Sequence, residues 1–203
     1  MCALFGSADR GLFQELAALN SYRGNHSYSV SVFDFESVNV VDKSLGEFTM
    51  PQVVGPYYLG HTQAPTTEAK STASIHPSTI EGTYLWHNGI IKENQVKAWQ
   101  QELNLAEPWD TKLMHQLLYY KAPAEVLNKA DGSFACVWYH DGGLYLFRNA
   151  NCPLFTDGTN YSSTKFSGSD PIKDGILYRM MKDGIVETDI TFATYNEFFW
   201  SPE

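Results

Sequence analysis

The spacing of hydrophobic residues changes several times along the chain. The opening run CALF predicts a short strand that ends at Gly6. Leucines at helical spacing then predict a helix over residues 9–21, because they fall on one stripe of its surface. Valine and serine alternate within residues 28–34, which predicts a strand with one buried and one exposed face. Further strands are predicted at 57–62 and 82–91.

Helical spacing returns after residue 91. Val96, Trp99 and Leu103 mark one helix. A second apolar stripe marks another helix, for which Asp110 is the predicted N-cap. A shorter helical piece is predicted near Pro123.

The last third of the chain is dominated by strand signals. Residues 133–139 are apolar on both faces, which predicts a strand between two layers. The Asp-Gly-Gly run at 141–143 predicts a tight turn into a strand at 144–148. Further short strands are predicted near 163–167, 176–181 and 185–189. This order of elements predicts an α+β fold in which helices cover the outer faces of two stacked sheets.

Composition and charge exclude several classes of function. Lys and Arg number 14 and Asp and Glu 23, which gives a net charge of −9. A chain this acidic is a poor candidate for binding a phosphate backbone, so we expect no direct contact with nucleic acid. We find no apolar stretch of about 20 residues for a membrane span and no signal-peptide pattern.

The three cysteines and six histidines show no metal-ligand spacing, and an odd, sparse set of cysteines favours a reducing compartment. We therefore expect a cytoplasmic protein without a structural metal site. No repeat or linker divides the sequence, which predicts a single domain over residues 1–203. Residues 63–79 are polar and rich in Thr and Ser, and we interpret them as a long loop, of a length that often forms a functional lid.

Cys2 is the most informative position. It follows the initiator Met1, which we expect to be removed because the second residue is small. A terminal cysteine carries a thiol and an α-amine on one residue, with ordinary pKa values of about 8.5 and about 8. The amine can therefore act as the base for its own nucleophile near neutral pH.

Two strand ends carry further candidate chemistry. His87, Asn88 and Gly89 follow the apolar run TYLW. By itself an Asn-Gly pair there is a turn signal, but the Asn amide and the Gly N–H could also form an oxyanion hole. His61 stands at the other strand end, and Arg23 lies in the turn after the first helix.

In their order and spacing these blocks resemble the class II glutamine amidotransferase domain of the N-terminal-nucleophile (Ntn) hydrolases. The resemblance runs over residues 2–170. The matching blocks are CALFG after the Met-Cys start, RGNHS, GHTQAPT, HNGII, WDTKLMHQLL, and DGSFACVWY followed by LYLFRNANCPLF. The resemblance implies a four-layer αββα sandwich of two stacked, mainly antiparallel sheets.

The resemblance also implies a mechanism and a set of site residues. Cys2 would attack the side-chain amide of glutamine, Asn88 and Gly89 would stabilise the oxyanion, and Arg23 would brace the Cys2 region. Ammonia would leave, and water would clear the thioester, a chemistry that needs no metal and no cofactor. The loop after Gln63, within residues 63–79, would close over the substrate. The residues that match the family's substrate contacts are His61, Gln63, Thr66, His87 and Asp110.

Two positions depart from the family pattern. The family arginine that grips the α-carboxylate of glutamine falls at Gln63, so a charge-assisted contact becomes a neutral hydrogen bond. Glutamine would then bind about tenfold more weakly. The family's acidic residue in the RGNHS block is His26.

The sequence leaves three interpretations of the function. The leading one is a glutaminase subunit that supplies ammonia to a separate synthase or ligase, since the chain ends soon after the domain. The second is a stand-alone hydrolase of γ-glutamyl or other amides, which Gln63 favours. The third is an inactive interaction module, which a retained Met1 would favour because it blocks the amine. The sequence leaves open whether the chain forms a homo-oligomer.

Overall fold

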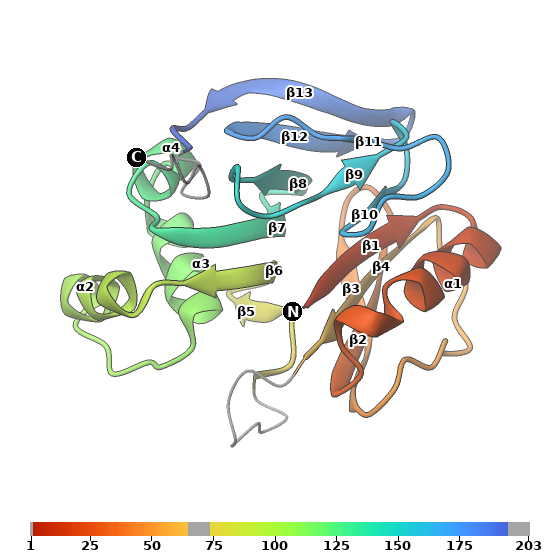
Figure 1. Ribbon diagram of the computed structural model, residues 1–203, viewed down its shortest axis with the longest axis horizontal. Coiled ribbons are helices and arrows are strands. Elements are labelled where there is room, and N and C mark those ends of the chain that lie inside the picture. Colours follow the sequence, from red (N-terminus) through yellow and green to blue (C-terminus); the bar gives the residue numbers. More distant parts are fainter. Residues whose placement is uncertain (1, 65–73, 195–203) are drawn as a thin grey trace, which may run out of the picture.

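The structure, a computed structural model, describes residues 2–64 and 74–194. Within these residues two antiparallel sheets lie between helices (Figure 1). The first sheet contains β1 Ala3–Ser7, β2 Ser27–Phe33, β3 Val38–Leu45, β4 Tyr57–Gln63, β9 Phe155–Thr156, β10 Tyr161–Ser162 and β11 Asp170–Pro171. Its strand order is β11-β9-β10-β1-β4-β2-β3, so β1 lies near the middle.

The second sheet is built from the later part of the chain. It contains β5 Ser78–Ile80, β6 Thr83–Ile91, β7 Gly132–His140, β8 Gly143–Arg148, β12 Ile176–Met181 and β13 Gly184–Thr191. Its order is β13-β12-β8-β7-β6-β5. The helical segments are α1 Arg10–Leu19, the 3₁₀ turn η1 Ser21–Arg23, α2 Glu93–Leu103, α3 Asp110–Tyr120 and α4 Pro123–Leu127.

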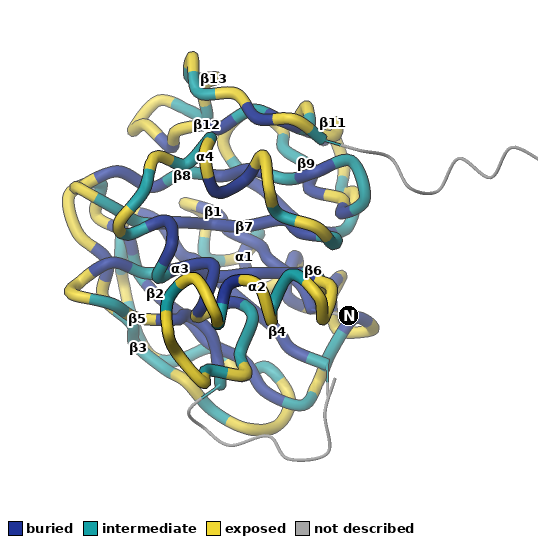
Figure 2. Tube along the Cα trace, turned by 90° about the vertical axis from the view of Figure 1, so that its left-hand side faces the viewer, coloured by how far each residue is buried: buried dark blue, intermediate teal, exposed yellow. Residues whose placement is uncertain are grey.

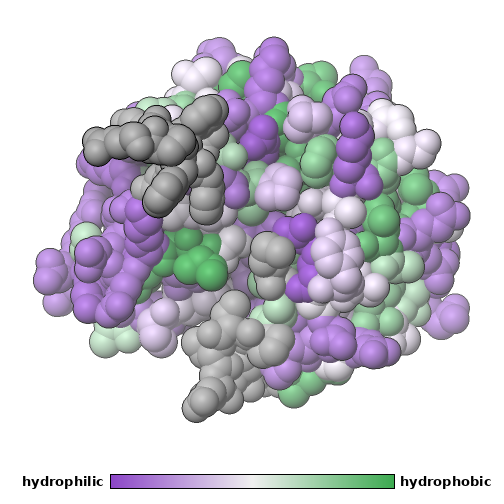
Figure 3. Space-filling model, viewed as in Figure 1, coloured by the Kyte–Doolittle hydropathy of each residue, from purple (hydrophilic) through white to green (hydrophobic). Residues whose placement is uncertain are grey.

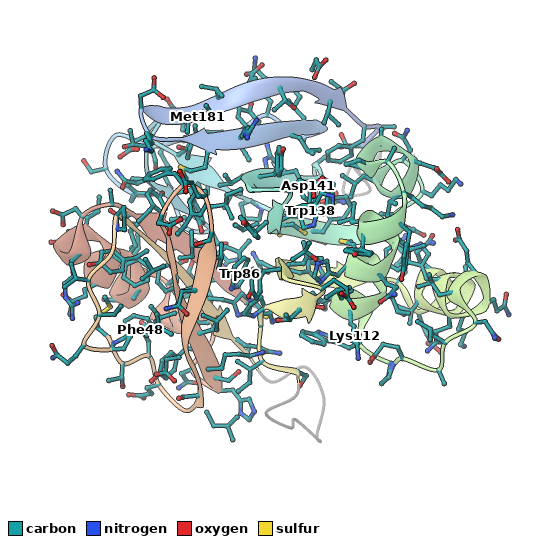
Figure 4. The ribbon with its side chains drawn as sticks, turned by 180° about the vertical axis from the view of Figure 1, so that it is seen from behind. Phe48, Trp86, Lys112, Trp138, Asp141 and Met181 are labelled. Atoms are coloured by element: carbon teal, nitrogen blue, oxygen red, sulfur yellow. The ribbon has the colours of Figure 1, made fainter. Side chains whose placement is uncertain are left out.

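Three apolar clusters separate four layers. The central cluster lies between the sheets and includes Leu4, Leu59 and Trp86. A second joins α2, α3 and α4 to the second sheet, and a third joins α1 to the first sheet. Figure 2 shows the buried strands in the interior, and Figure 4 shows Trp86 between the sheets and Phe48 on the outer side of the first sheet. The predicted αββα sandwich is confirmed.

The helices form where the apolar spacing predicts them. Asp9 caps α1 by accepting from the backbone N–H of Leu12 at 2.7 Å, and the buried face of this helix presents Phe13, Leu16 and Ala17. Polar side chains cover the region of α2 at the left of Figure 3. No described helix has the length and apolar character that a membrane span requires.

Several predictions of local structure need correction. Ser29 and Ser31 do not form an exposed face, because both faces of β2 are covered and both side chains are fully buried. Asp110 is not the N-cap of its helix but the first helical residue, after Trp109 at the cap position. The predicted strand near 163–167 is replaced by the shorter β10, which ends at Ser162.

The predicted loop over 63–79 is shorter at both ends. Gln63 is the last residue of β4, and Ser78 already begins β5. The central part of this segment, including Thr66, lies outside the described residues. The eight-residue β3 and the three-residue β5 have no counterpart among the sequence predictions, because their polar residues obscure the alternation of apolar and polar positions.

Candidate active site

Cys2 precedes the central strand of the first sheet. Its side chain is buried, with 7% exposed. Ala3 pairs with Thr62 of β4, which places the next residues, Cys2 and Gln63, at the same end of these two strands. That end of β1 lies beside β6 of the second sheet (Figure 1). The predicted nucleophile therefore stands where the two sheets approach each other.

Arg23 holds the backbone of Cys2. It is the last residue of η1 and is buried, and its Nε donates to the carbonyl oxygen of Cys2 at 3.1 Å. The guanidinium also lies 5.9 Å from the centre of the Tyr22 ring. The turn after α1, which by composition is an ordinary basic turn, thus brings a cation to the start of β1. Its contact with Cys2 is of the bracing kind that the sequence resemblance implies.

Asn88 reaches the start of β1 from the second sheet. Its side chain is buried, and its Nδ2 donates to Ser163 Oγ at 3.2 Å. The same Ser163 oxygen accepts from the backbone N–H of Leu4 at 3.0 Å, and the Ser163 N–H donates to the Leu4 carbonyl at 2.8 Å. Ser163 therefore links Asn88 to the residue two positions after Cys2.

Gly89 occupies a position that a side chain would not fit. Its φ is +144°, and a Cβ added there would stand 1.9 Å from the carbonyl oxygen of Ser133 on β7. Glycine is required because φ lies outside the usual range of L-residues and the neighbouring backbone approaches closely. The Asn-Gly pair is therefore not the turn that its composition suggests, but the interior of β6.

A chain of histidines fixes the middle of β6. His87 Nδ1 and His76 Nε2 each lie 3.1 Å from the hydroxyl oxygen of Thr111. His61 Nε2 lies 3.1 Å from the carbonyl oxygen of His87, and the His61 and His76 rings are 4.0 Å apart. One hydroxyl has a single proton, so at least one of the two histidines donates to Thr111. This network joins β4, β6 and α3 beside Asn88.

Asp110 connects α3 to the same strand. Its Oδ2 accepts from the backbone N–H of Ile91 at 3.1 Å, and its Oδ1 accepts from the N–H of Thr111 at 2.7 Å. Oδ1 also accepts from the Thr111 hydroxyl at 3.3 Å, so Oδ2 is the oxygen that can accept a further hydrogen bond. The geometry therefore leaves Asp110 able to receive a cationic group while it anchors the first turn of α3.

Gln63 is a buried side chain at the end of β4, with 6% exposed. Its Oε1 accepts from Ser27 Oγ at 3.1 Å, and its backbone oxygen accepts from the N–H of His26 at 3.0 Å. A Cβ on Gly24 would lie 2.4 Å from the Gln63 carbonyl carbon, so the two segments pack closely. The position that the sequence resemblance matches to an arginine is thus occupied by an amide whose oxygen is hydrogen-bonded to a serine.

Sequence reasoning missed several residues that hold this site. Ser163 and Thr111 bridge predicted site residues, and Asn149 fixes the start of β7. Asn149 Nδ2 donates to the Gly132 carbonyl at 2.7 Å, and its Oδ1 accepts from the Phe134 N–H at 3.1 Å. In the sequence, Asn149 stands out only as part of the block LYLFRNANCPLF, and this block does not indicate what its side chain contacts. Among the described residues, no group of three or more His, Cys, Asp or Glu could hold a metal ion.

Comparisons with known proteins agree with the fold. No family model matches the chain. A curated relative, glutamine–fructose-6-phosphate aminotransferase (isomerizing) from Agrobacterium fabrum, is 26% identical over 175 residues, which cover 74% of this chain and 28% of the relative. The chain therefore spans little more than a quarter of that protein's length.

Two solved structures are similar in fold. Glutamine phosphoribosylpyrophosphate amidotransferase from B. subtilis has a TM-score of 0.70 at 15% identity, over 93% of this chain and 49% of that one. A glutamine aminotransferase class-II domain protein from Silicibacter pomeroyi has a TM-score of 0.53 at 10% identity, over 97% and 100% of the two chains. The resemblance to class II glutamine amidotransferase domains is confirmed, and the expectation of an enzyme agrees with these relatives.

Proposed function

We propose that this chain, which resembles class II glutamine amidotransferase domains, hydrolyses the side-chain amide of glutamine with Cys2 as its nucleophile. The observation that carries the proposal is the hydrogen-bonded link from Asn88 through Ser163 to Leu4. It joins a buried amide donor on the second sheet to the start of β1, two residues from the thiol. A nucleophile and a fixed donor on opposite sheets are the two groups that acyl transfer requires.

The first half of the reaction forms a thioester. After removal of Met1, the α-amine of Cys2 takes the thiol proton, and the sulfur attacks the amide carbon of glutamine. The Asn88 amide and the Gly89 N–H stabilise the oxyanion of the tetrahedral intermediate. The intermediate then collapses, the C–N bond breaks, and the nitrogen leaves as ammonia with the proton that the amine held.

The second half regenerates the thiol. A water molecule attacks the γ-glutamyl thioester, the C–S bond breaks, and glutamate leaves. The α-amine takes the proton of the water and returns it to the sulfur. Arg23 acts in both halves by bracing the backbone of Cys2 through its carbonyl oxygen.

Recognition of the substrate rests on the polar groups around the strand ends. Asp110 pairs with the α-ammonium of glutamine, while His61 and His87 fix the walls of the site through the Thr111 network. Thr66 and the segment around it are proposed to close over the substrate. Gln63 replaces the charged grip on the α-carboxylate, and we expect weaker binding of free glutamine for this reason.

The ammonia is proposed to pass to a separate synthase or ligase, with no cofactor in this half-reaction. One observation favours a second candidate function, the hydrolysis of γ-glutamyl or other amides without transfer. The Gln63 side chain already accepts a hydrogen bond from Ser27. A substrate with no free carboxylate at this point would therefore lose less binding free energy than glutamine does. A cytoplasmic location stays a prediction.

The decisive experiment is ammonia release from L-glutamine by protein whose N-terminus is confirmed to be Cys2, with Cys2→Ala as the matched control. We expect release from the wild type and none from the variant. A panel of γ-glutamyl amides measured in parallel separates the two candidates. Protein that starts at Cys2 and cleaves neither glutamine nor the amides would contradict the proposal and favour a binding module.

A further inference from the structure

Cys152 lies against Asn88, the proposed oxyanion donor. Its Sγ donates to the Asn88 carbonyl oxygen at 3.1 Å, and the Asn88 Nδ2 donates back to the same sulfur at 3.4 Å. Cys152 is buried, with 4% exposed, in the cluster between the sheets. One side chain therefore contacts both the backbone and the amide of Asn88.

We infer that Cys152 is a positioning residue, whose thiol sets the orientation of the Asn88 amide for the reaction at Cys2. This inference rests on the proposed function. The sulfur and Ser163 Oγ take hydrogen bonds from the same Nδ2, so the amide is held from two sides. An amide held in this way is aligned before the substrate arrives, and such preorganisation is what makes an oxyanion donor effective.

The chemistry of sulfur suits this role. A thiol sulfur is a weak acceptor, so one amide proton can turn from it to a developing oxyanion at little cost. Burial raises the pKa of the Cys152 thiol to about 11. The group therefore stays protonated across the neutral range and keeps its donor bond to Asn88. It also places no negative charge beside a Cys2 thiolate, which a second ionised sulfur would disfavour.

The segment that carries Cys152 is itself fixed. At the start of β7, the Asn149 side chain donates to the Gly132 carbonyl and accepts from the Phe134 N–H. The Ser133 hydroxyl donates to the Asn151 carbonyl at 3.2 Å. The backbone N–H of Cys152 donates to the Asn149 carbonyl at 3.4 Å. These bonds anchor the segment to β7, the strand that pairs with β6 opposite Asn88. The thiol is thus held against Asn88 by a rigid support rather than by chance contact.

The test is glutaminase kinetics on Cys152→Ala, Cys152→Val and Cys152→Ser. Alanine and valine remove the donor, and valine also fills the volume if the smaller residue fails to fold. For both we expect kcat to fall about two- to tenfold with KM unchanged, the rate equivalent of one hydrogen bond. Serine keeps a donor and should recover part of the rate, because its oxygen accepts more strongly than sulfur and holds the amide proton more tightly. Cys136→Ala is the matched control, because Cys136 is equally buried but lies in the cluster on the helix side.

A double-mutant cycle with Asn88→Ala separates positioning from mere stability. If Cys152 acts through Asn88, its removal should cost nothing further in the Asn88→Ala background. Two results would overturn this inference but leave the proposed function standing. One is a wild-type kcat in Cys152→Ala and Cys152→Val, and the other is a double variant in which the two losses of kcat multiply. A wild type without Cys2-dependent ammonia release would overturn the proposed function and this inference with it.

Discussion

Gly89→Ala tests a residue that pairs with β7 and is also a proposed donor to the oxyanion. The new Cβ would stand 1.9 Å from the carbonyl oxygen of Ser133 and 2.9 Å from Nε2 of His87. The nearest obstacle is backbone in a paired strand, which cannot rotate away as a side chain could. The φ of +144° adds strain for any residue with a Cβ. We therefore expect β6 and β7 to separate locally at this point.

The magnitude follows from these two costs. Overpacking a closed contact costs about 1–3 kcal/mol, and holding an L-residue in a sparsely populated conformation costs about 1–3 kcal/mol. A total of about 2–6 kcal/mol corresponds to a fall in Tm of about 4–24 °C for a domain of this size. Displacing the Gly89 N–H from the proposed oxyanion hole should also lower kcat about 100- to 1,000-fold.

Thermal unfolding and ammonia release, measured on the same samples, check both effects. Gly82→Ala is the matched control, because Gly82 has a φ of +77° but no atom within 4 Å of the added Cβ. It should lose only about 1–2 kcal/mol from conformation and keep its kcat. A Gly89→Ala protein as stable and as active as Gly82→Ala would refute the argument from close approach.

Three further predictions follow from single side chains. Burial, and secondarily the charge of His140, lowers the pKa of His115 to about 4 from an ordinary 6.5. The free energy of unfolding that this shift contributes is present in full above pH 6.5 and is lost as the pH falls toward 4, by at most about 3 kcal/mol. Urea unfolding at pH 7.5 and 4.5 should show this loss, and His115→Gln should flatten the pH dependence of the free energy of unfolding. Asp110→Asn should raise the KM for glutamine about tenfold or more with little change in kcat, since a charged hydrogen bond is lost; an unchanged KM would remove Asp110 from the substrate. Asp9→Ala removes the cap of α1 and should lower the free energy of unfolding, measured by chemical denaturation, by about 1 kcal/mol. A loss smaller than about 0.3 kcal/mol would contradict this prediction.

The layered fold could be predicted because the longer helices and strands carry a clear pattern of apolar residues, whether one face of the element is buried or both. Residues 133–139 are apolar throughout, and they form the inner part of β7 between two layers. Ser29 and Ser31 misled the prediction, because small hydroxyl side chains fit between two packed layers although their alternation resembles an exposed face. Short strands such as β9 and β11 could not be predicted, since two residues contain no period.

The site could be predicted only in part. Cys2, Arg23, Asn88 and Gly89 stand in recognisable blocks, and the structure brings Arg23 to Cys2 and Asn88 to the start of β1. The residues that hold them in place could not be found, because contacts such as Ser163 to Leu4 span 159 positions of sequence. No local pattern encodes a partner at that separation.

The central claim is that Cys2 is the nucleophile, and the most direct test is to find the thioester. Protein that begins at Cys2 would be mixed with L-glutamine, quenched in acid and digested, and its cysteine-containing peptides weighed by mass spectrometry. The account predicts one added glutamyl group on the peptide that starts with Cys2, and none on the peptides that contain Cys136 or Cys152. Ammonia release with no adduct on Cys2, or with the adduct on Cys152, would contradict it.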